Sequence, residues 1–290
     1  MLAKLTQSET ALSQAHFKSL THLLVVLPKP RNEADSFSRA FPGEATLRNT
    51  FKRRNKKFTD LIDEPIAAQT PEGKLAAWVM LDPAKSRFEQ LTAMRKAVKL
   101  LLDESPPALY VSLHGEDGER KLGAELAVYC ALLNGAALPT RKSKSDAKPL
   151  KQIMLFGYRA ADMFAGQRAV AEGNTLTREL TLLPPNDLTP RTYRARIAEI
   201  AKEHGWKRAE FDMKKLREMG AGAFVAVAQG SHDDDAAIVR LSYKPRGAKQ
   251  QIALVGKGVC FDTGGHNLKS SKYMYGMHGD MNGSAVVLGI

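Results

Sequence analysis

The sequence predicts an α/β fold arranged as two domains, and three observations lead to that prediction. Short apolar runs rich in β-branched residues recur along the chain, and segments with apolar residues at helical spacing separate them. Such alternation of strands and helices is typical of a largely parallel sheet. Hydrophobic residues make up 43% of the 290 residues and charged residues 26%, a balance that excludes a disordered tail and a fibrous repeat.

The first domain contains the clearest alternation. Apolar runs predict buried strands, and apolar positions at helical spacing predict helices. The predicted elements are, in order, a strand at 21–27, a strand at 75–81, a helix at 86–102, a strand at 108–113, a helix at 120–138 and a strand at 152–157. The segment at 139–151 is polar, basic and bounded by prolines, which predicts a hinge or surface loop.

The second domain begins with a long helix that ends before Pro184 and Pro185. Thr189 and Pro190 open the next helix, because proline is favoured at the first helical position. The predicted elements are, in order, a helix at 160–182, a helix at 190–204, and strands at 223–228, 236–243 and 251–255. The boundary is predicted near 158–165, so the domains are expected to span 1–160 and 161–290.

The chain is expected to be a cytoplasmic protein that does not span a membrane. No apolar run approaches the roughly 18 residues that a membrane helix needs. The N-terminus has no continuous apolar region of the secretory type. Two cysteines, Cys130 and Cys260, are too few for a disulfide framework and indicate a reducing compartment.

The net charge of +12 raises the question of a nucleic-acid partner. Basic residues gather at 52–57 and again at 141–148, and such clusters can bind phosphates. Neither cluster contains interleaved aromatic residues or a known nucleic-acid motif. A solvated surface is therefore the favoured interpretation, and DNA binding is kept as an alternative.

The residues that predict chemistry lie in the stretch 252–289. Lys257, Asp262, Lys269 and Asp280 are separated there by several glycines. Charged residues on glycine-rich loops that follow a buried strand commonly form the sites of α/β enzymes, and two carboxylates suit a divalent metal ion. Spacing alone leaves a metal site open, because Lys257 and Asp262 would point to opposite faces of a regular strand unless the glycines bend the backbone.

This stretch resembles the signature of the leucyl aminopeptidase family, the cytosolic two-metal exopeptidases. V-G-K-G at 255–258, F-D-T-G-G at 261–265, Lys269 and D-M at 280–281 match with the family's gaps, and upstream segments extend the resemblance over about 172–290. Residues 1–157 are similar to the family's macro-like N-terminal domain. The resemblance thus implies a macro-like α/β domain followed by the first part of an α/β/α zinc-peptidase-like catalytic domain with a mixed sheet.

The resemblance also implies an activity, namely metal-dependent release of N-terminal amino acids from peptides with a leucine-type preference. Lys257, Asp262 and Asp280 would be metal ligands, with Asp262 bridging two divalent ions, Mn²⁺ or Zn²⁺. Lys269 would be the catalytic residue that stabilises the oxyanion. Lys257, Asp262 and Lys269 would also contact the substrate, together with Met274 as a pocket residue. A bound bicarbonate and a homohexamer are further features of the family.

Several neighbouring residues are of types that could take part, but the simpler interpretation is preferred for each. His266 and His278 are expected to lie outside the ligand set, because the family pattern uses neither. Cys260 stands between apolar residues and is expected to be a core residue. The aspartates at 233–235 are expected to form a solvated loop between strands.

The family has a further acidic cluster and an arginine downstream of Asp280, whereas this sequence ends at residue 290. Two divalent ions carry four positive charges, and Asp262 with Asp280 supplies only two negative charges. We therefore expect the sequence to be the front part of an aminopeptidase, and residues 1–290 to be inactive alone. A stable, truncated and inactive relative is the remaining alternative, besides a DNA-binding protein in a primary or second role.

Overall fold

The computed structural model describes residues 2–30, 40–143 and 148–290. Two compact units are present, Met1–Thr175 and Leu176–Ile290, and the division lies inside helix α5 (Ala165–Leu182). A compact unit is not by itself an independently folding domain, so the limits 1–160 and 161–290 remain a prediction.

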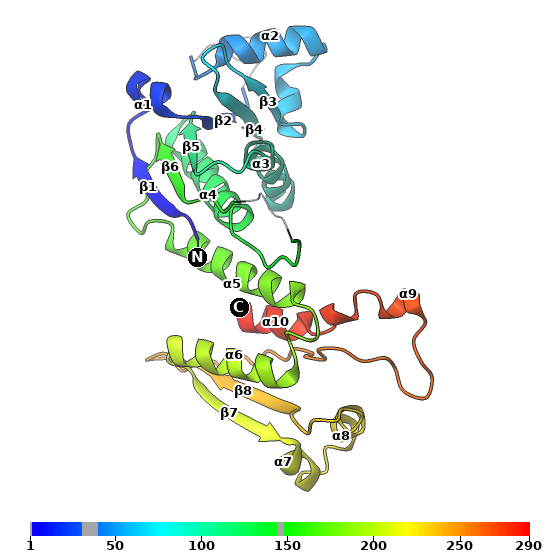
Figure 1. The fold of residues 1–290 in the computed structure, drawn as a ribbon. Helices are drawn as coiled ribbons and strands as arrows, with labels where there is room; N and C mark the ends of the chain where they lie inside the picture. Colours follow the sequence, from blue (N-terminus) through cyan, green and yellow to red (C-terminus); the bar gives the residue numbers. More distant parts are fainter. Residues whose placement is uncertain (1, 31–39, 144–147) are drawn as a thin grey trace. The chain divides into compact units, whose positions relative to one another are not determined.

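The first unit contains a six-stranded sheet in which every neighbouring pair but one is parallel (Figure 1). The exception is the edge strand β3, which runs antiparallel to β4. The sheet confirms the predicted α/β class and the four strands predicted in this part of the chain. Across the sheet, the strands are β1 (Lys4–Ser8), β6 (Gln152–Phe156), β5 (Ala108–Leu113), β2 (His22–Pro28), β4 (Leu75–Leu81) and β3 (Ile66–Gln69).

Both faces of this sheet are covered, which explains why its central strands are apolar at consecutive positions. In β2, Leu24 and Val26 pack into one core with the helices α3 (Arg87–Leu102) and α4 (Asp117–Asn134). Leu23 and Val25 face the opposite core. That second core also contains residues of α2 (Glu44–Arg54) and η2 (Phe58–Ile62), while the short helix α1 (Gln14–Ser19) precedes β2.

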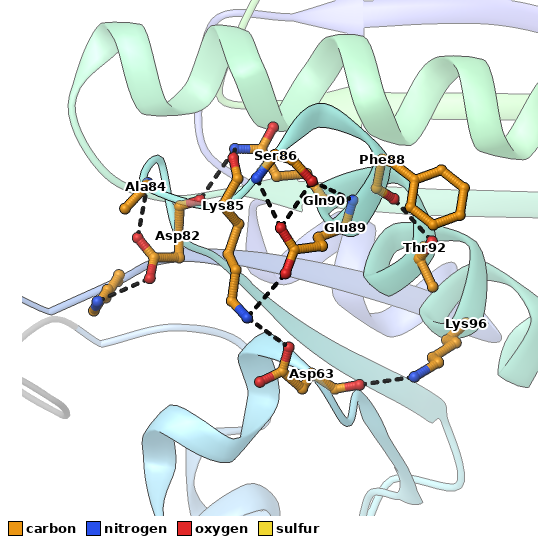
Figure 2. Close-up of polar contacts among 11 residues, drawn as sticks. Asp63, Asp82, Ala84, Lys85, Ser86, Phe88, Glu89, Gln90, Thr92 and Lys96 are labelled. Atoms are coloured by element: carbon orange, nitrogen blue, oxygen red, sulfur yellow. Dashed lines mark hydrogen bonds and ion pairs between the residues drawn. The ribbon is translucent and has the colours of Figure 1, made fainter.

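The first turn of α3 is fixed to the end of β4 by a network of polar contacts (Figure 2). Ser86 caps the helix, because its hydroxyl accepts from the Glu89 N–H at 3.3 Å and the Glu89 carboxylate accepts from the Ser86 N–H at 2.9 Å. Lys85 Nζ lies 3.2 Å from Glu89 and 3.4 Å from Asp63. The buried Gln90 donates from Nε2 to the Asp82 carbonyl at 3.0 Å. The network therefore anchors α3 to the end of β4.

Replacing Ser86 with alanine is expected to lower the free energy of unfolding of the first unit by about 1 kcal/mol, the usual cost of losing a helix cap. Ser86→Thr is the matched control, because its hydroxyl can accept the same N–H bond and can still donate to the Glu89 carboxylate, as that of Ser86 does at 2.7 Å. Urea unfolding followed by circular dichroism would measure both variants. Equal stability of Ser86→Ala and the unmodified chain would contradict a capping role.

The second unit contains an antiparallel pair of strands, β7 (Lys207–Asp212) and β8 (Ala237–Ser242). Helix α6 (Pro190–Glu203) begins at the predicted Thr189 cap, and its Tyr193 and Ile200 lie in an apolar core with Cys260, Met281 and Leu288. The remaining elements are α7 (Met213–Glu218), α8 (Gly222–Ala228), α9 (Ser271–Met274), η3 (Met277–Gly279) and α10 (Asn282–Gly289). No helix within the described ranges is both long and apolar enough to cross a lipid bilayer.

Two predicted strands of this unit are wrong. Residues 223–228 form helix α8, because three alanines favour a helix and the partly covered positions follow helical rather than alternating spacing. Residues 251–255 are neither helix nor strand, and Ile252 and Val255 are 81% and 94% exposed. An apolar run becomes a buried strand only where a neighbouring strand pairs with it. The loop predicted at 139–151 is irregular at 139–142, while 144–147 lie outside the described residues.

Candidate metal centre

The four charged residues singled out by the sequence lie on loops that lead into and out of α9. Lys257 and Asp262 belong to the irregular segment before it, Lys269 lies just ahead of it, and Asp280 follows η3. The turn after Asp262 depends on Gly264, whose φ of +107° is strained for any residue with a side chain. The Gly264 N–H donates to Asp262 Oδ1 at 2.9 Å, so the turn itself orients the carboxylate.

The first of two lysine–aspartate pairs joins Lys257 to Asp280. Lys257 Nζ lies 2.8 Å from Asp280 Oδ2, and their side chains are 62% and 29% exposed. The hydrogen bond to Asp280 raises the pKa of Lys257, and the charge of Asp262 adds to the effect. In the absence of a metal ion, Lys257 is therefore an ammonium group close to both carboxylates.

The second pair joins Lys269 to Asp262. Lys269 Nζ forms an ion pair with Asp262 Oδ1 and also lies 3.4 Å from the Asp262 carbonyl oxygen. The hydrogen bond from Lys269 lowers the pKa of Asp262, and the charge of Lys257 contributes to the same shift. The structure thus brings together all four residues, since each carboxylate is paired with one lysine and Lys257 acts on both.

Two carboxylates and an amine are suitable donors for one divalent ion. An ammonium group has no free electron pair, so Lys257 would have to lose a proton before it could become a ligand. In the described ranges no three His, Cys, Asp or Glu side chains converge on a common point where a metal ion could bind. The residues present therefore supply part of the coordination of one ion, with Lys257, Asp262 and Asp280 as the donors.

The remaining candidate residues differ in how far they are exposed. Met274 ends α9 and is partly covered, which leaves its role as a pocket residue a prediction. His266 is exposed in the loop after Gly265, and His278 is partly covered within η3. Cys260 is 8% exposed and burial raises the pKa of its thiol to about 11, as expected for a core residue rather than a nucleophile.

The three consecutive aspartates form ion pairs rather than a metal cluster. Asp233 and Asp234 are exposed, as predicted, and Asp234 accepts two hydrogen bonds of 2.9 Å from Arg217. Asp235 differs from the expectation of a solvated loop, because its side chain is only 11% exposed. Its carboxylate accepts from the Arg191 N–H at 3.1 Å in the first turn of α6, where the helix dipole favours a negative charge.

The basic cluster at 52–57 has a structural explanation of its own. Lys52, Arg53 and Arg54 are exposed on the last turn of α2, where positive charge is favoured by the helix dipole. Lys56 forms an ion pair of 2.6 Å with Glu64. In the second cluster, Lys144 lies outside the described residues. DNA binding stays an alternative.

Residues 175–290 match the catalytic-domain model of the cytosol aminopeptidase family. A probable cytosol aminopeptidase of Prochlorococcus marinus (strain MIT 9312) is 40% identical over 152 residues, covering 51% of this chain and 31% of that protein. Its counterpart in Afipia carboxidovorans is 36% identical over 199 residues, covering 66% of this chain and 39% of the relative. The matched region thus spans 31–39% of the length of these curated relatives.

Solved structures share the fold over nearly the whole chain. The bottromycin maturation enzyme BotP in complex with Mn superposes with a TM-score of 0.66 at 25% identity, covering 92% of this chain and 54% of that one. A variant of tomato leucine aminopeptidase superposes with a TM-score of 0.68 at 20% identity, covering 99% of this chain and 58% of the plant chain. The match to BotP and the tomato enzyme confirms the fold class predicted from the sequence.

Proposed function

We propose that the complete protein releases N-terminal amino acids from peptides with the help of divalent metal ions, because residues 175–290 match the catalytic-domain model of the cytosol aminopeptidase family. The complete protein means residues 1–290 together with any residues encoded beyond them. The observation that carries the proposal is the pairing of Lys257 with Asp280 and of Lys269 with Asp262 on glycine-rich loops inside the matched domain. Two lysines and two carboxylates at one place supply part of the groups that such a hydrolysis requires.

The residues of this chain would divide the work between binding and charge stabilisation. Asp262 and Asp280 would supply carboxylate oxygens, and Lys257 would supply its amine after losing a proton. Bound divalent ions would supply an activated water and positive charge near the scissile carbonyl. Lys269 would remain an ammonium group and stabilise the negative charge that develops on the carbonyl oxygen. Its present hydrogen bond to Asp262 holds it beside the metal ligands without making it one.

We extend the proposal to the finer properties that the resemblance implies. These are two ions per site, either Mn²⁺ or Zn²⁺, with a bicarbonate, a leucine-type preference in a pocket that includes Met274, a cytoplasmic location and a homohexamer. The similarity to probable cytosol aminopeptidases supports the cytosolic aminopeptidase part of this set, and the Mn complex of BotP supports a divalent metal.

Exhaustive chelation is expected to abolish hydrolysis of leucine anilide by the complete protein, because the bound ions would supply the activated water and positive charge beyond that of Lys269. Adding Mn²⁺ or Zn²⁺ back should restore the activity, which separates metal loss from denaturation. Full activity after chelation would contradict the proposed function. A complete protein that stays inactive with either metal would favour the alternative of an inactive relative.

A further inference from the structure

The backbone beside Lys257 lies directly against the first turn of α10. A Cβ atom added to Gly256 would lie 2.5 Å from Ser284 Cα and 2.6 Å from the Gly283 carbonyl oxygen. The contact is mutual, because a Cβ on Gly283 would lie 3.2 Å from the Lys257 nitrogen. Gly256 therefore needs glycine for proximity rather than for an unusual φ, whereas Gly283 is closely approached without a strict requirement; neither has a positive φ.

Several hydrogen bonds at Ser284 reinforce this backbone contact. The Ser284 N–H donates to the Lys257 carbonyl at 2.8 Å and is shared with the Met281 carbonyl at 3.0 Å. The Ser284 hydroxyl donates to the Met281 carbonyl at 2.7 Å and lies 3.0 Å from the hydroxyl of Tyr193. A serine hydroxyl has one proton, so the Tyr193 hydroxyl must be the donor in the last contact. Tyr193 is 5% exposed in the core of the second unit and thus ties Ser284 to α6.

The contact joins the segments of Asp280 and Lys257, which are held in place by different interactions. Asp280 stands between η3 and α10 and is placed by their hydrogen bonds, including its own N–H to the Met277 carbonyl at 3.1 Å. Lys257 lies in a segment with neither helix nor strand. The contact with α10 thus takes the place of a sheet ladder in determining where Lys257 lies relative to Asp280.

We propose that the Gly256–Gly283 contact, held by Ser284 and Tyr193, is the device that positions Lys257 beside Asp280 for metal binding. The proposal rests on the proposed function, because it assigns Lys257 and Asp280 to one metal ion. Gly256, Ser284 and Tyr193 are positioning residues, since each acts on the ligands through the backbone of α10 or of the segment at 256–257.

The test compares Gly256→Ala with Gly222→Ala in the complete protein. Gly222 lies in the same unit with nothing within 4 Å of an added Cβ and no positive φ, so the same change has no cost in proximity there. Two readouts are used, hydrogen exchange of the Ser284 amide without metal and the affinity for Mn²⁺ by calorimetry and electron paramagnetic resonance. Gly256→Ala should speed the exchange and weaken Mn²⁺ binding, each at least tenfold, and alter the Mn²⁺ spectrum. Gly222→Ala should change neither by more than twofold.

Tyr193→Phe tests the same device should Gly256→Ala fail to fold, because it removes only one hydroxyl. It should speed Ser284 exchange and weaken Mn²⁺ binding severalfold. Unchanged exchange at Ser284 or unchanged Mn²⁺ affinity in a folded Gly256→Ala protein would overturn the proposal, as would both being unchanged in Tyr193→Phe. A wild-type protein that binds no Mn²⁺ would overturn the proposed function as well, whereas normal binding in Gly256→Ala would overturn the positioning alone.

Discussion

Replacing Asp262 with alanine is expected to abolish turnover of the complete protein. Asp262 forms an ion pair with Lys269, and the charge of Lys257 also lowers the pKa of Asp262. Its removal therefore takes away a carboxylate that interacts with both lysines. Loss of a ligand from a metal-assisted hydrolysis costs several kcal/mol of transition-state stabilisation, which is on the order of a thousandfold in rate. The loss should appear in kcat and be accompanied by weaker metal binding.

His266→Ala is the matched control for this change, because His266 lies four residues away in the same loop and is exposed. Steady-state hydrolysis of leucine anilide at saturating Mn²⁺ would measure both variants, with thermal melting to verify that each is folded. His266→Ala should retain activity within a few-fold of the unmodified protein. If the two substitutions cost the same, the assignment of ligands is wrong.

The sheet of the first unit could be predicted from the sequence because its central strands are buried on both faces. Such strands have continuous apolar runs, as at Leu23 to Leu27, which stand out against amphipathic helices. The edge strands β1 and β3 were not predicted. They are short and only partly buried, and residues such as Thr6 and Gln7 in β1 are indistinguishable from a loop before the partner strand is known.

In the second unit, apolar runs in the sequence do not suffice to predict which segments form strands. Residues 223–228 and 251–255 are apolar enough for strands, but strand formation depends on a pairing partner far away in the sequence. The charged residues of the candidate site could be found from their spacing and the family signature. The contact between Gly256 and Gly283 could not, because a glycine required for proximity looks the same in sequence as a glycine required by a turn. Ser284 and Tyr193 likewise meet only in the folded chain, 91 residues apart.

Residues 1–290 on their own are expected to bind at most one divalent ion weakly and to release no amino acids. Two divalent ions carry four positive charges, whereas Asp262 and Asp280 provide two negative charges and Lys257, once neutral, provides none. No third acidic, histidine or cysteine side chain converges with these carboxylates in the described ranges. A second ion would therefore share one carboxylate and otherwise depend on water.

The exposure of residues around the ligands also predicts weak metal binding by residues 1–290. Phe261 and Leu268, in the loop that carries Asp262, are 41% and 67% exposed, so little packing holds that loop. Loosely held ligands lose metal affinity as well as catalytic rate. Calorimetric titration of residues 1–290 with Mn²⁺ and with Zn²⁺, beside a leucine-anilide assay, would measure both quantities. Two tight sites or metal-dependent cleavage would show that the residues described here are sufficient, because the charge deficit at Asp262 and Asp280 would then not limit either binding or hydrolysis.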